Sequence, residues 1–402
     1  MKPVSTMVLA AAMALALAAP GQAQQQPSLA KEERAALLTL SNALQARDYG
    51  AATQALATAQ AAARSGYARY LASSLQLKLG IDTNNIGLQQ TAIDSIISSG
   101  AAPAAELPQL YRNQAALLQA SSKLDKAEAS YSRVLELAPN DADAMLALAQ
   151  VKHLRKKPQE GIALIDRAVA VREAAGQPVP ESWYKRGLDL ALANKMAPQA
   201  MKFSRGLVAA YPSAANWRDV VLVHRDFASA DPAAALNGWR LARASKALAG
   251  ERDYIEFARA LDAAGYEGEA KAVLDEGVAA KMIDPAGSAA KALIASVGKA
   301  AVPGRRALAG LETKAGAAAA TGPAALSAAD AHLGYGEYGK AASLYRAALG
   351  KGSVDADLAN VNLGIAHAMA GQKAEAEAAF RAVGGPRADL ASLWLVWLGR
   401  TA

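Results

Sequence analysis

The sequence predicts an all-α solenoid, a row of helical hairpins stacked side by side and closed by a helix at the C-terminus. Apolar residues recur with helical spacing in segments of about ten to fifteen residues, separated by short Gly, Pro, Asn or Asp turns. No segment alternates apolar and polar residues as a half-buried strand would. A small residue also returns at a nearly constant interval, from Ala127 to Gly161 and from Ala341 to Ala376. An interval of about 34 residues is the length of one helical hairpin in a repeat array.

Each repeat is marked by a small residue followed four positions later by a bulkier one, as in Ala127 and Tyr131. The small residue lets the two helices of a hairpin touch, and the larger one, a turn further along the same face, fills the space to the next hairpin. One hairpin cannot bury its own apolar face, so stability comes from stacking neighbours. The residues expected to carry this structural signature are Ala52, Ala127, Tyr131, Pro139, Ala200, Ala270, Ala341, Tyr345, Gly364, Ala376 and Phe380.

These positions resemble the tetratricopeptide repeat (TPR) family, in its exported bacterial form. The third copy matches through Leu124, Ala127, Tyr131 and Pro139, and the last through Gly364, Gly371, Ala376 and Phe380. The resemblance covers about residues 33–400. It implies a right-handed α-solenoid of about ten hairpins with a C-terminal capping helix, and a protein that binds protein partners.

The N-terminus has the features of a signal peptide over residues 1–23. Lys2 gives a positive start, an apolar run follows from Val8 to Ala19, and Gly21 and Ala23 supply small residues before the expected cleavage point. A spanning helix needs about 20 apolar residues, so a retained membrane anchor is the less favoured alternative. The chain has no cysteine, which excludes both acylation as a lipoprotein and disulfide bonds. We therefore expect a periplasmic or secreted protein that does not span the membrane after cleavage.

The remaining segments follow in order. Residues 24–32 are a polar leader, and residues 33–284 are TPR-like repeats, with residues 67–107 degenerate because they lack a clear alanine and aromatic pair. Residues 285–321 contain Pro303-Gly304 and are either a degenerate repeat, which we favour, or a joint. Two further repeats occupy residues 322–390.

Residues 391–402 are expected to form the capping helix. Trp394 and Trp397 lie three residues apart and share one helical face with Leu390 and Leu393. This face either packs as the end of the array, which is the favoured interpretation, or is an exposed docking surface.

The charge and chemistry of the chain exclude several functions. The net charge of +7 is spread along the sequence rather than gathered in a stripe, so no nucleic-acid partner is expected. There is no nucleophile elbow, phosphate-binding loop or dinucleotide-binding glycine motif. The four histidines have no partners at metal-ligand spacing. We expect no enzyme activity, no cofactor and no metal site.

The resemblance suggests that first-helix residues line an inner groove, and these residues are the candidate partner-binding positions. The last copy presents an apolar end, which could hold the apolar face of a helix or an extended peptide; alternatively, these residues are covered as core. The middle of the groove is mixed and polar. The apolar candidates are Leu358, Val361, Ile365 and Ala368, and the cationic candidates are Arg112, Lys185, Arg252 and Arg259.

The function expected from the sequence is a non-catalytic protein-protein interaction scaffold in the periplasm, with a protein or peptide partner in the cell envelope and a role in an assembly, export or secretion complex. The alternative is a TPR module that binds peptidoglycan or polysaccharide through aromatic platforms, for which Trp183, Trp217 and Trp239 are the candidates. An enzyme is the least favoured class. The sequence leaves the partner, the process and the oligomeric state open.

Overall fold

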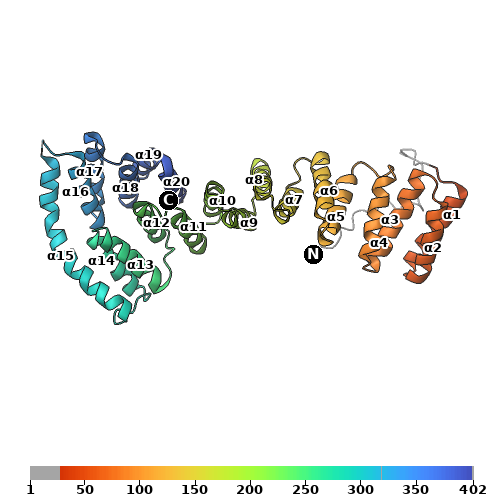
Figure 1. Cartoon of the computed structure of the whole chain (residues 1–402), viewed down its shortest axis with the longest axis horizontal. Helices are drawn as coiled ribbons and strands as arrows, with labels where there is room; N and C mark the ends of the chain where they lie inside the picture. The colour runs from red at the N-terminus through yellow and green to blue at the C-terminus, as the bar shows by residue number, and fades with distance from the viewer. Residues whose placement is uncertain (1–27, 318, 401–402) are drawn as a thin grey trace. The chain divides into compact units, whose positions relative to one another are not determined.

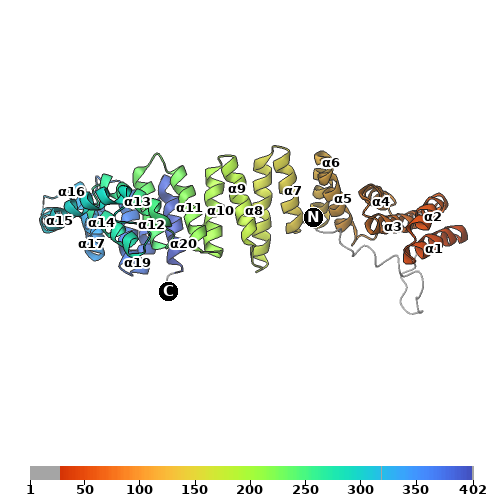
Figure 2. The ribbon, with the colours of Figure 1, turned by 90° about the horizontal axis from the view of Figure 1, so that it is seen from below.

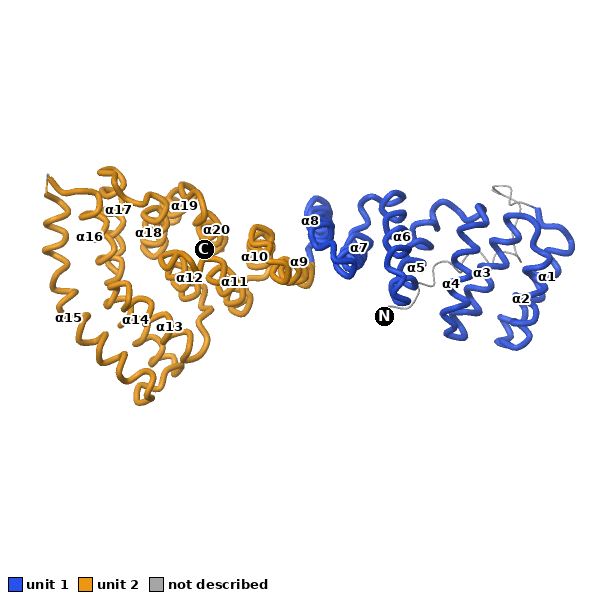
Figure 3. Tube along the Cα trace, viewed as in Figure 1, with its two compact units in different colours: residues 1–179 blue, residues 180–402 orange. Residues whose placement is uncertain are grey.

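The computed structural model describes residues 28–317 and 319–400, and the expected signal peptide (residues 1–23) and the start of the polar leader (residues 24–27) lie outside this range. Within it the chain is all helical and divides into two compact units, residues 1–179 and residues 180–402 (Figure 3). The expected all-α helical-repeat solenoid is confirmed.

Unit 1 consists of four helical hairpins. Each hairpin pairs two consecutive helices across a short turn. Helices α7 and α8, for example, lie side by side in Figure 2. The bounds are α1 (Lys31–Gln45), α2 (Tyr49–Ala62), α3 (Gly66–Asp82), α4 (Ile86–Ser98), α5 (Leu107–Ala120), α6 (Leu124–Leu137), α7 (Ala142–Leu154) and α8 (Pro158–Ala174).

Unit 2 contains five hairpins, one long unpaired helix and a final helix within its described residues (Figure 1). The hairpins are α9 (Glu181–Ala193) with α10 (Ala197–Ala210), α11 (Ala214–Phe227) with α12 (Pro232–Ala244), α13 (Gly250–Ala263) with α14 (Glu267–Ala279), α16 (Gly322–Gly334) with α17 (Tyr338–Lys351), and α18 (Ala356–Met369) with α19 (Lys373–Arg381). The long helix is α15 (Ser288–Gly316), and a 3-10 turn, η2 (Gly385–Arg387), leads into α20 (Ala388–Leu398).

The signature alanines occupy one structural position. Ala127 is the fourth residue of α6 and Ala376 the fourth of α19, and the same holds for the signature alanines of α2, α10, α14 and α17; all six are fully buried. Small residues on the first helix serve the same contact, since a Cβ added at Gly364 would lie 2.5 Å from the ring of Phe380. Close helix approach therefore explains why these positions stay small. Of the other signature residues, Tyr131 and Tyr345 are buried and Pro139 is exposed in a turn.

Residues 67–107 fold as the hairpin of α3 and α4 and the turn that leads into α5. The fourth residue of α4 is Gln89 instead of alanine. Its side chain is buried and donates a hydrogen bond to the carbonyl of Gly80 at 2.9 Å. Gly80 leaves the room, because a Cβ there would lie 2.9 Å from the backbone nitrogen of Gln89. The signature alanine is absent from α4 because the small residue of this helix contact, Gly80, lies on α3, the first helix of the hairpin.

The structure departs from expectation over residues 285–321. The favoured degenerate repeat would need two short helices, whereas α15 is one helix of 29 residues with Pro303 inside it. Pro303 cannot donate a backbone hydrogen bond, and such a residue usually ends or bends a helix. The hydroxyl of Tyr335 donates to the carbonyl of Ala301 at 2.8 Å on this stretch, so a contact from the next hairpin supports the helix beside the proline.

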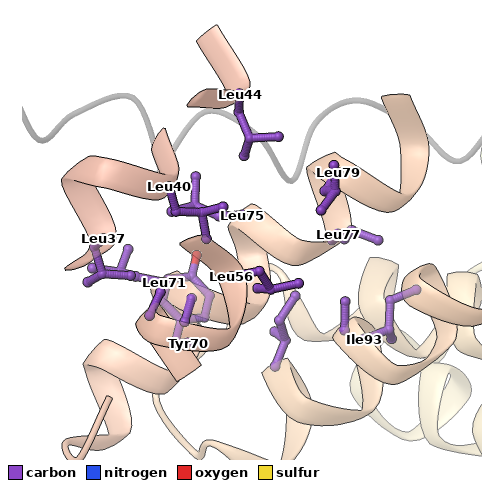
Figure 4. Packing of buried hydrophobic residues seen from close by; sticks show 14 of the residues in the cluster. Leu37, Leu40, Leu44, Leu56, Tyr70, Leu71, Leu75, Leu77, Leu79 and Ile93 are labelled. Atoms are coloured by element: carbon purple, nitrogen blue, oxygen red, sulfur yellow. The ribbon is translucent and has the colours of Figure 1, made fainter. Parts of the chain in front are cut away.

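The core of unit 1 is rich in leucine. Figure 4 shows Leu37 and Leu40 of α1 packed with Leu71 and Leu75 of α3, and Ile93 of α4 belongs to the same cluster. Burying each such side chain contributes about 1.5–3 kcal/mol.

Glu33 joins the start of the array to the next hairpin. One carboxylate oxygen accepts from the backbone N–H of Ala30 at 2.9 Å, which caps α1. The other accepts from the backbone N–H groups of Arg64 and Ser65 at 3.0 and 2.9 Å, ahead of α3. The carboxylate of Glu33 is only 5% exposed, and these charge-assisted hydrogen bonds compensate it for the loss of contact with water.

Unit 2 closes on itself through its last helices. The helix α20 packs on α19 but also on α10 and α12, and α18 packs on α12; in Figure 1, α20 lies beside α12. The indole N–H of Trp397 donates to the carbonyl of Ala244 at 3.2 Å, and Arg205 of α10 pairs with Asp389 at 2.6 Å. The end of the chain therefore covers earlier repeats of the same unit.

Arg387 ties this closure to two helix starts. It donates to Asp231 at 2.8 Å and to Asp355 at 2.5 Å. Each aspartate uses its other oxygen as an N-cap, Asp231 for α12 and Asp355 for α18. One guanidinium thus joins two hairpins that are far apart in the sequence.

Candidate functional site

The main pocket of unit 2 has a volume of about 860 Å³ and results from the closure of the unit. Its lining comes from the second helices α12 and α14, the middle of α15, the turn between α16 and α17, and the inner sides of α18 and α20. Apolar groups of the lining include Ala272, Val302, Leu333, Ile365 and Trp394. Pockets of this size accommodate small ligands or short chain segments.

Tyr335 forms part of the pocket wall. Its ring lies against Gly268 of α14, where a Cβ would come within 2.6 Å, and its hydroxyl reaches α15, where a Cβ at Gly304 would come within 2.2 Å. The guanidinium of Arg305 lies 5.8 Å from the ring centroid. Two glycines on two helices thus make room for one aromatic side chain, and no sequence pattern predicts this role for a turn residue between Gly334 and Gly336.

The acidic residues of the pocket lining are all engaged in ion pairs with basic residues of the same lining. Glu269 pairs with Arg240 at 2.6 Å and Glu276 with Arg243 at 2.7 Å. Asp275 pairs with Lys271 at 2.6 Å. These three acids are therefore neutralised within the wall of the pocket.

Three further cations of the lining have no comparable partner: Lys246, Arg305 and Arg306. Arg305 comes no closer than 3.7 Å to Glu337 and is 62% exposed. Lys246 and Arg306 are exposed, and neither side chain forms a hydrogen bond or ion pair within the part of the chain that the structure describes. We call these three residues the cationic rim; it leaves the pocket with an excess of positive charge.

A buried polar network lies behind the pocket. Arg240 is 5% exposed, donates to both carboxylate oxygens of Glu269 and donates to Asn237 at 2.7 Å. Asn237 donates to Asn362 at 2.9 Å, and Asn362 donates to Asp330 at 3.2 Å. The network spans α12, α14, α16 and α18, so it fixes these helices relative to one another.

Asp330 is the titratable end of this network. Burial raises the pKa of its carboxyl above the ordinary value, although the hydroxyl of Tyr345, which donates at 2.5 Å, and the charge of Arg240 oppose the shift. Burial also raises the pKa of Tyr266 to about 12. Neither residue lines the main pocket.

A second pocket of about 450 Å³ lies between α12, α13 and α18, and its lining includes Leu236, Tyr266, Leu358 and Asn362. Leu358 is therefore the one apolar candidate from the sequence that reaches a described pocket as a partly exposed side chain.

The expected open apolar groove through Leu358, Val361, Ile365 and Ala368 is wrong for its two central residues. Val361 is 0% and Ile365 is 2% exposed. They are covered because α18 packs against α16, α17 and α12 at once. Leu358 and Ala368 are half-buried. The inner face of the last repeat is thus core, although Ile365 contributes to the floor of the main pocket.

The four cationic candidates lie outside both described pockets. Arg112 forms an ion pair with Asp141, and Lys185 pairs with Glu181 at 2.7 Å. Arg252 pairs with Glu256 at 2.7 Å yet is 85% exposed, and Arg259 is exposed two turns further along α13. The structure therefore brings only Arg252 and Arg259 together, on one face of one helix.

The tryptophans are used for packing. Trp183, Trp217 and Trp239 are 8%, 3% and 4% exposed. Trp394 is fully buried, and it stacks on Phe380 with ring centroids 5.7 Å apart and meets Trp397 edge to face at 5.4 Å. The indole N–H of Trp394 has no hydrogen-bond acceptor among the residues that the structure describes.

Within residues 28–317 and 319–400 there is no cluster of three or more His, Asp or Glu side chains suited to a metal ion. His332 and His367 are buried at matching places in adjacent repeats. His332 meets Glu337 at 2.9 Å and His367 meets Gln372 at 2.6 Å. In the same described ranges, no helix is both long and apolar enough to cross a bilayer.

Stacked antiparallel hairpins with a conserved small-residue position define a helical-repeat protein, the class whose surfaces bind other molecules. Residues 112–178 and 326–389 match the family model described as a tetratricopeptide repeat. The chain is a tetratricopeptide repeat protein, and its fold is that of a protein-interaction scaffold. The resemblance to this family is confirmed, and its exported form stays a prediction.

Solved structures to which the chain shows similarity include PilW, described as a widely conserved type IV pilus biogenesis factor, at 17% identity over 45% of this chain and 79% of that one, with a TM-score of 0.31. A tetratricopeptide repeat protein from Parabacteroides merdae matches at 11% identity over 84% of this chain and 99% of that one, with a TM-score of 0.34. A structure titled as the functional characterization of Pseudomonas aeruginosa pilF matches at 15% identity over 47% of this chain and 96% of that one, with a TM-score of 0.25. No curated protein matches the chain. The family assignment rests on the two matched segments and the repeat geometry, not on these structures.

Proposed function

We propose that this chain is a non-catalytic scaffold that binds a protein partner in the cell envelope. The observation that carries the proposal is the main pocket of unit 2. Its walls are stacked repeat helices, and its three acids are each held by a base, as in the pair of Glu269 with Arg240. An acid held in this way is a poor general acid or base, whereas exposed cations and apolar groups suit the recognition of another chain.

Partner recognition outside the pocket involves the exposed cations of first helices in this proposal. Arg252 and Arg259 on α13 are the best placed, because both side chains are exposed on one helix face. Arg112 and Lys185 contribute less, since their side chains are 34% and 47% exposed whereas that of Arg252 is 85% exposed.

A module that binds peptidoglycan or polysaccharide is the second candidate. Sugar rings stack on exposed aromatic faces, and the three tryptophans proposed as platforms are all buried. Their burial favours a protein partner. An enzyme remains the least favoured class.

The envelope location rests on the features of residues 1–23 and on the absence of cysteine. Its test is N-terminal sequencing of the protein after fractionation of the native cells. We expect a periplasmic or secreted chain that begins at Gln24. An intact chain that begins at Met1 and stays in the cytoplasm would overturn this part of the proposal.

The partner is tested by crosslinking and mass spectrometry in the native envelope. The wild type is compared with Arg252→Glu, Arg259→Glu and with a control, Lys291→Glu, Lys299→Glu, which makes the same change of charge on exposed residues of α15. We expect one protein partner to be lost from the first variant and kept in the control. If no protein crosslinks specifically to the wild type, the scaffold function is wrong.

A further inference from the structure

The pocket of unit 2 has a chemical character that narrows the choice of ligand. Every acid of its lining is paired with a base of the same lining, and the three cations of the rim, Lys246, Arg305 and Arg306, have no acid partner within that lining. Arg305 lies 3.7 Å from Glu337, which is outside the lining. An excess of positive charge around a partly apolar cavity attracts negative charge and disfavours cations.

The inner part of the pocket is apolar and aromatic. Ala272, Val302 and Tyr338 provide accessible apolar surface, and Val302, beside the rim on α15, is 53% exposed. Leu333, Ile365 and Trp394 also line this part of the pocket but are 4%, 2% and 0% exposed, so they form its covered floor. The ligand therefore needs an apolar group as well as negative charge.

Trp394 closes this apolar end of the pocket. Its indole N–H lacks an acceptor among the described residues, and the side chain is fully buried, so this donor is covered by the protein and is not presented to a ligand.

We propose that the pocket between α12, α14, α15 and α20 binds a short acidic segment of a partner protein, with acidic side chains at the cationic rim and an apolar or aromatic side chain against Ala272, Val302 and Tyr338. The inference rests on the proposed function in that the partner is a protein. It adds the chemistry of the segment and places the cationic rim just after α12 and on α15, not on the first helices that the family resemblance favoured. The volume of about 860 Å³ accommodates several residues of chain.

The test uses a peptide with blocked ends, acetyl-EEFEE-amide, titrated into the mature full-length chain by calorimetry. The matched peptide acetyl-QQFQQ-amide measures the contribution of charge. We expect the acidic peptide to bind at least about tenfold more tightly than the neutral one. The blocked ends exclude recognition of a terminal carboxylate.

The variant Arg305→Glu, Arg306→Glu should weaken binding of the acidic peptide by at least about tenfold, because it reverses two of the three rim charges. The control Lys291→Glu, Lys299→Glu changes the same helix and the same net charge outside the pocket lining. Its affinity should stay within about twofold of the wild type. Circular dichroism confirms that both variants are folded.

Three outcomes overturn the inference: no preference for the acidic peptide, an equal loss in both double variants, or rim-dependent binding of phosphatidylglycerol vesicles in place of the peptide. These results would leave the scaffold function standing if crosslinking still identifies a protein partner. Conversely, if no protein partner is found in the envelope, the proposed function is wrong, whatever the rim variants show.

Discussion

In unit 1 the main packing contacts join helices that are adjacent or next but one in the sequence, whereas in unit 2 α20 packs on α10 and α12. The hydrogen bond from Trp397 to Ala244 spans 153 residues, and that between Asn237 and Asn362 spans 125. The same hairpin is thus used in two ways. A row of neighbours leaves each repeat to depend on the next, and a closed arrangement makes distant repeats depend on one another.

The two units also differ in the kind of surface that they offer. Closure buries the inner face of the last repeat, including Val361, and at the same time creates the pocket with its cationic rim. In unit 2 the pocket is therefore a product of long-range packing.

The largest expected effect is that of Trp394→Ala. Trp394 is fully buried between Phe380 and Trp397, so its removal leaves a cavity and should lower the free energy of unfolding of unit 2 by about 3–5 kcal/mol. Calorimetry should show a lower transition temperature for unit 2 and an unchanged one for unit 1. An equal loss in both units would mean that they unfold as one, and the comparison would fail.

A smaller effect is expected in unit 1 from Glu33→Gln. The amide can keep only one acceptor oxygen, so at least one of the three backbone N–H groups at Ala30, Arg64 and Ser65 loses its partner. We expect a loss of about 1–3 kcal/mol, confined to the first hairpins and measured by urea unfolding. A loss that also appears in unit 2 would contradict nearest-neighbour stability.

Arg387→Met tests the ion pairs that close unit 2. Its partners are partly exposed, so the expected loss of unfolding free energy near pH about 7 is only about 1 kcal/mol. Burial raises the pKa values of Asp231 and Asp355, but helix N–H groups and Arg387 outweigh it and lower both. A lowered carboxyl pKa contributes stability above the ordinary value of about 3.9 and loses it as the pH falls below that value.

The difference between wild type and Arg387→Met should therefore shrink as the pH falls below about 3.9. Urea unfolding at several pH values measures it. A difference that stays constant into strong acid would show that Arg387 acts through packing alone.

The smallest effect is expected for Leu154→Ala. Leu154 ends α7, is 48% exposed and belongs to no core cluster, so its truncation should change the unfolding free energy by about 0.5 kcal/mol or less. It is the control for the truncations above. A larger loss would indicate that the end of α7 is covered in solution.

The fold could be predicted from the sequence because its signals are local. Ala127 and Ala376 recur at the repeat interval, and each is small for the same reason, close contact between two helices. Residues 285–321 could not be predicted in the same way. Pro303 and Gly304 suggest a turn, whereas the structure continues the helix through them and places the hydroxyl of Tyr335, from a later hairpin, on the carbonyl of Ala301 beside the proline.

The candidate site was mostly hidden from the sequence. The groove positions assumed that first helices stay open, but packing of α18 on α12 covers Val361 and Ile365. The rim residues Arg305 and Arg306 were visible only as a short basic cluster. The excess positive charge around them exists only because basic residues of α12 and α14 already pair with the acids of the pocket lining. No periodic sequence pattern specifies such distant pairings.

The most direct test of closure in unit 2 is hydrogen exchange by mass spectrometry, comparing Trp394→Ala with the wild type. Closure predicts faster amide exchange in α10, α12 and α18 as well as in α19 and α20, with α1 to α8 unchanged. Faster exchange limited to α19 and α20 would show that the last helix is only a local cap, and the account of unit 2 as a closed arrangement with a pocket of its own would be contradicted.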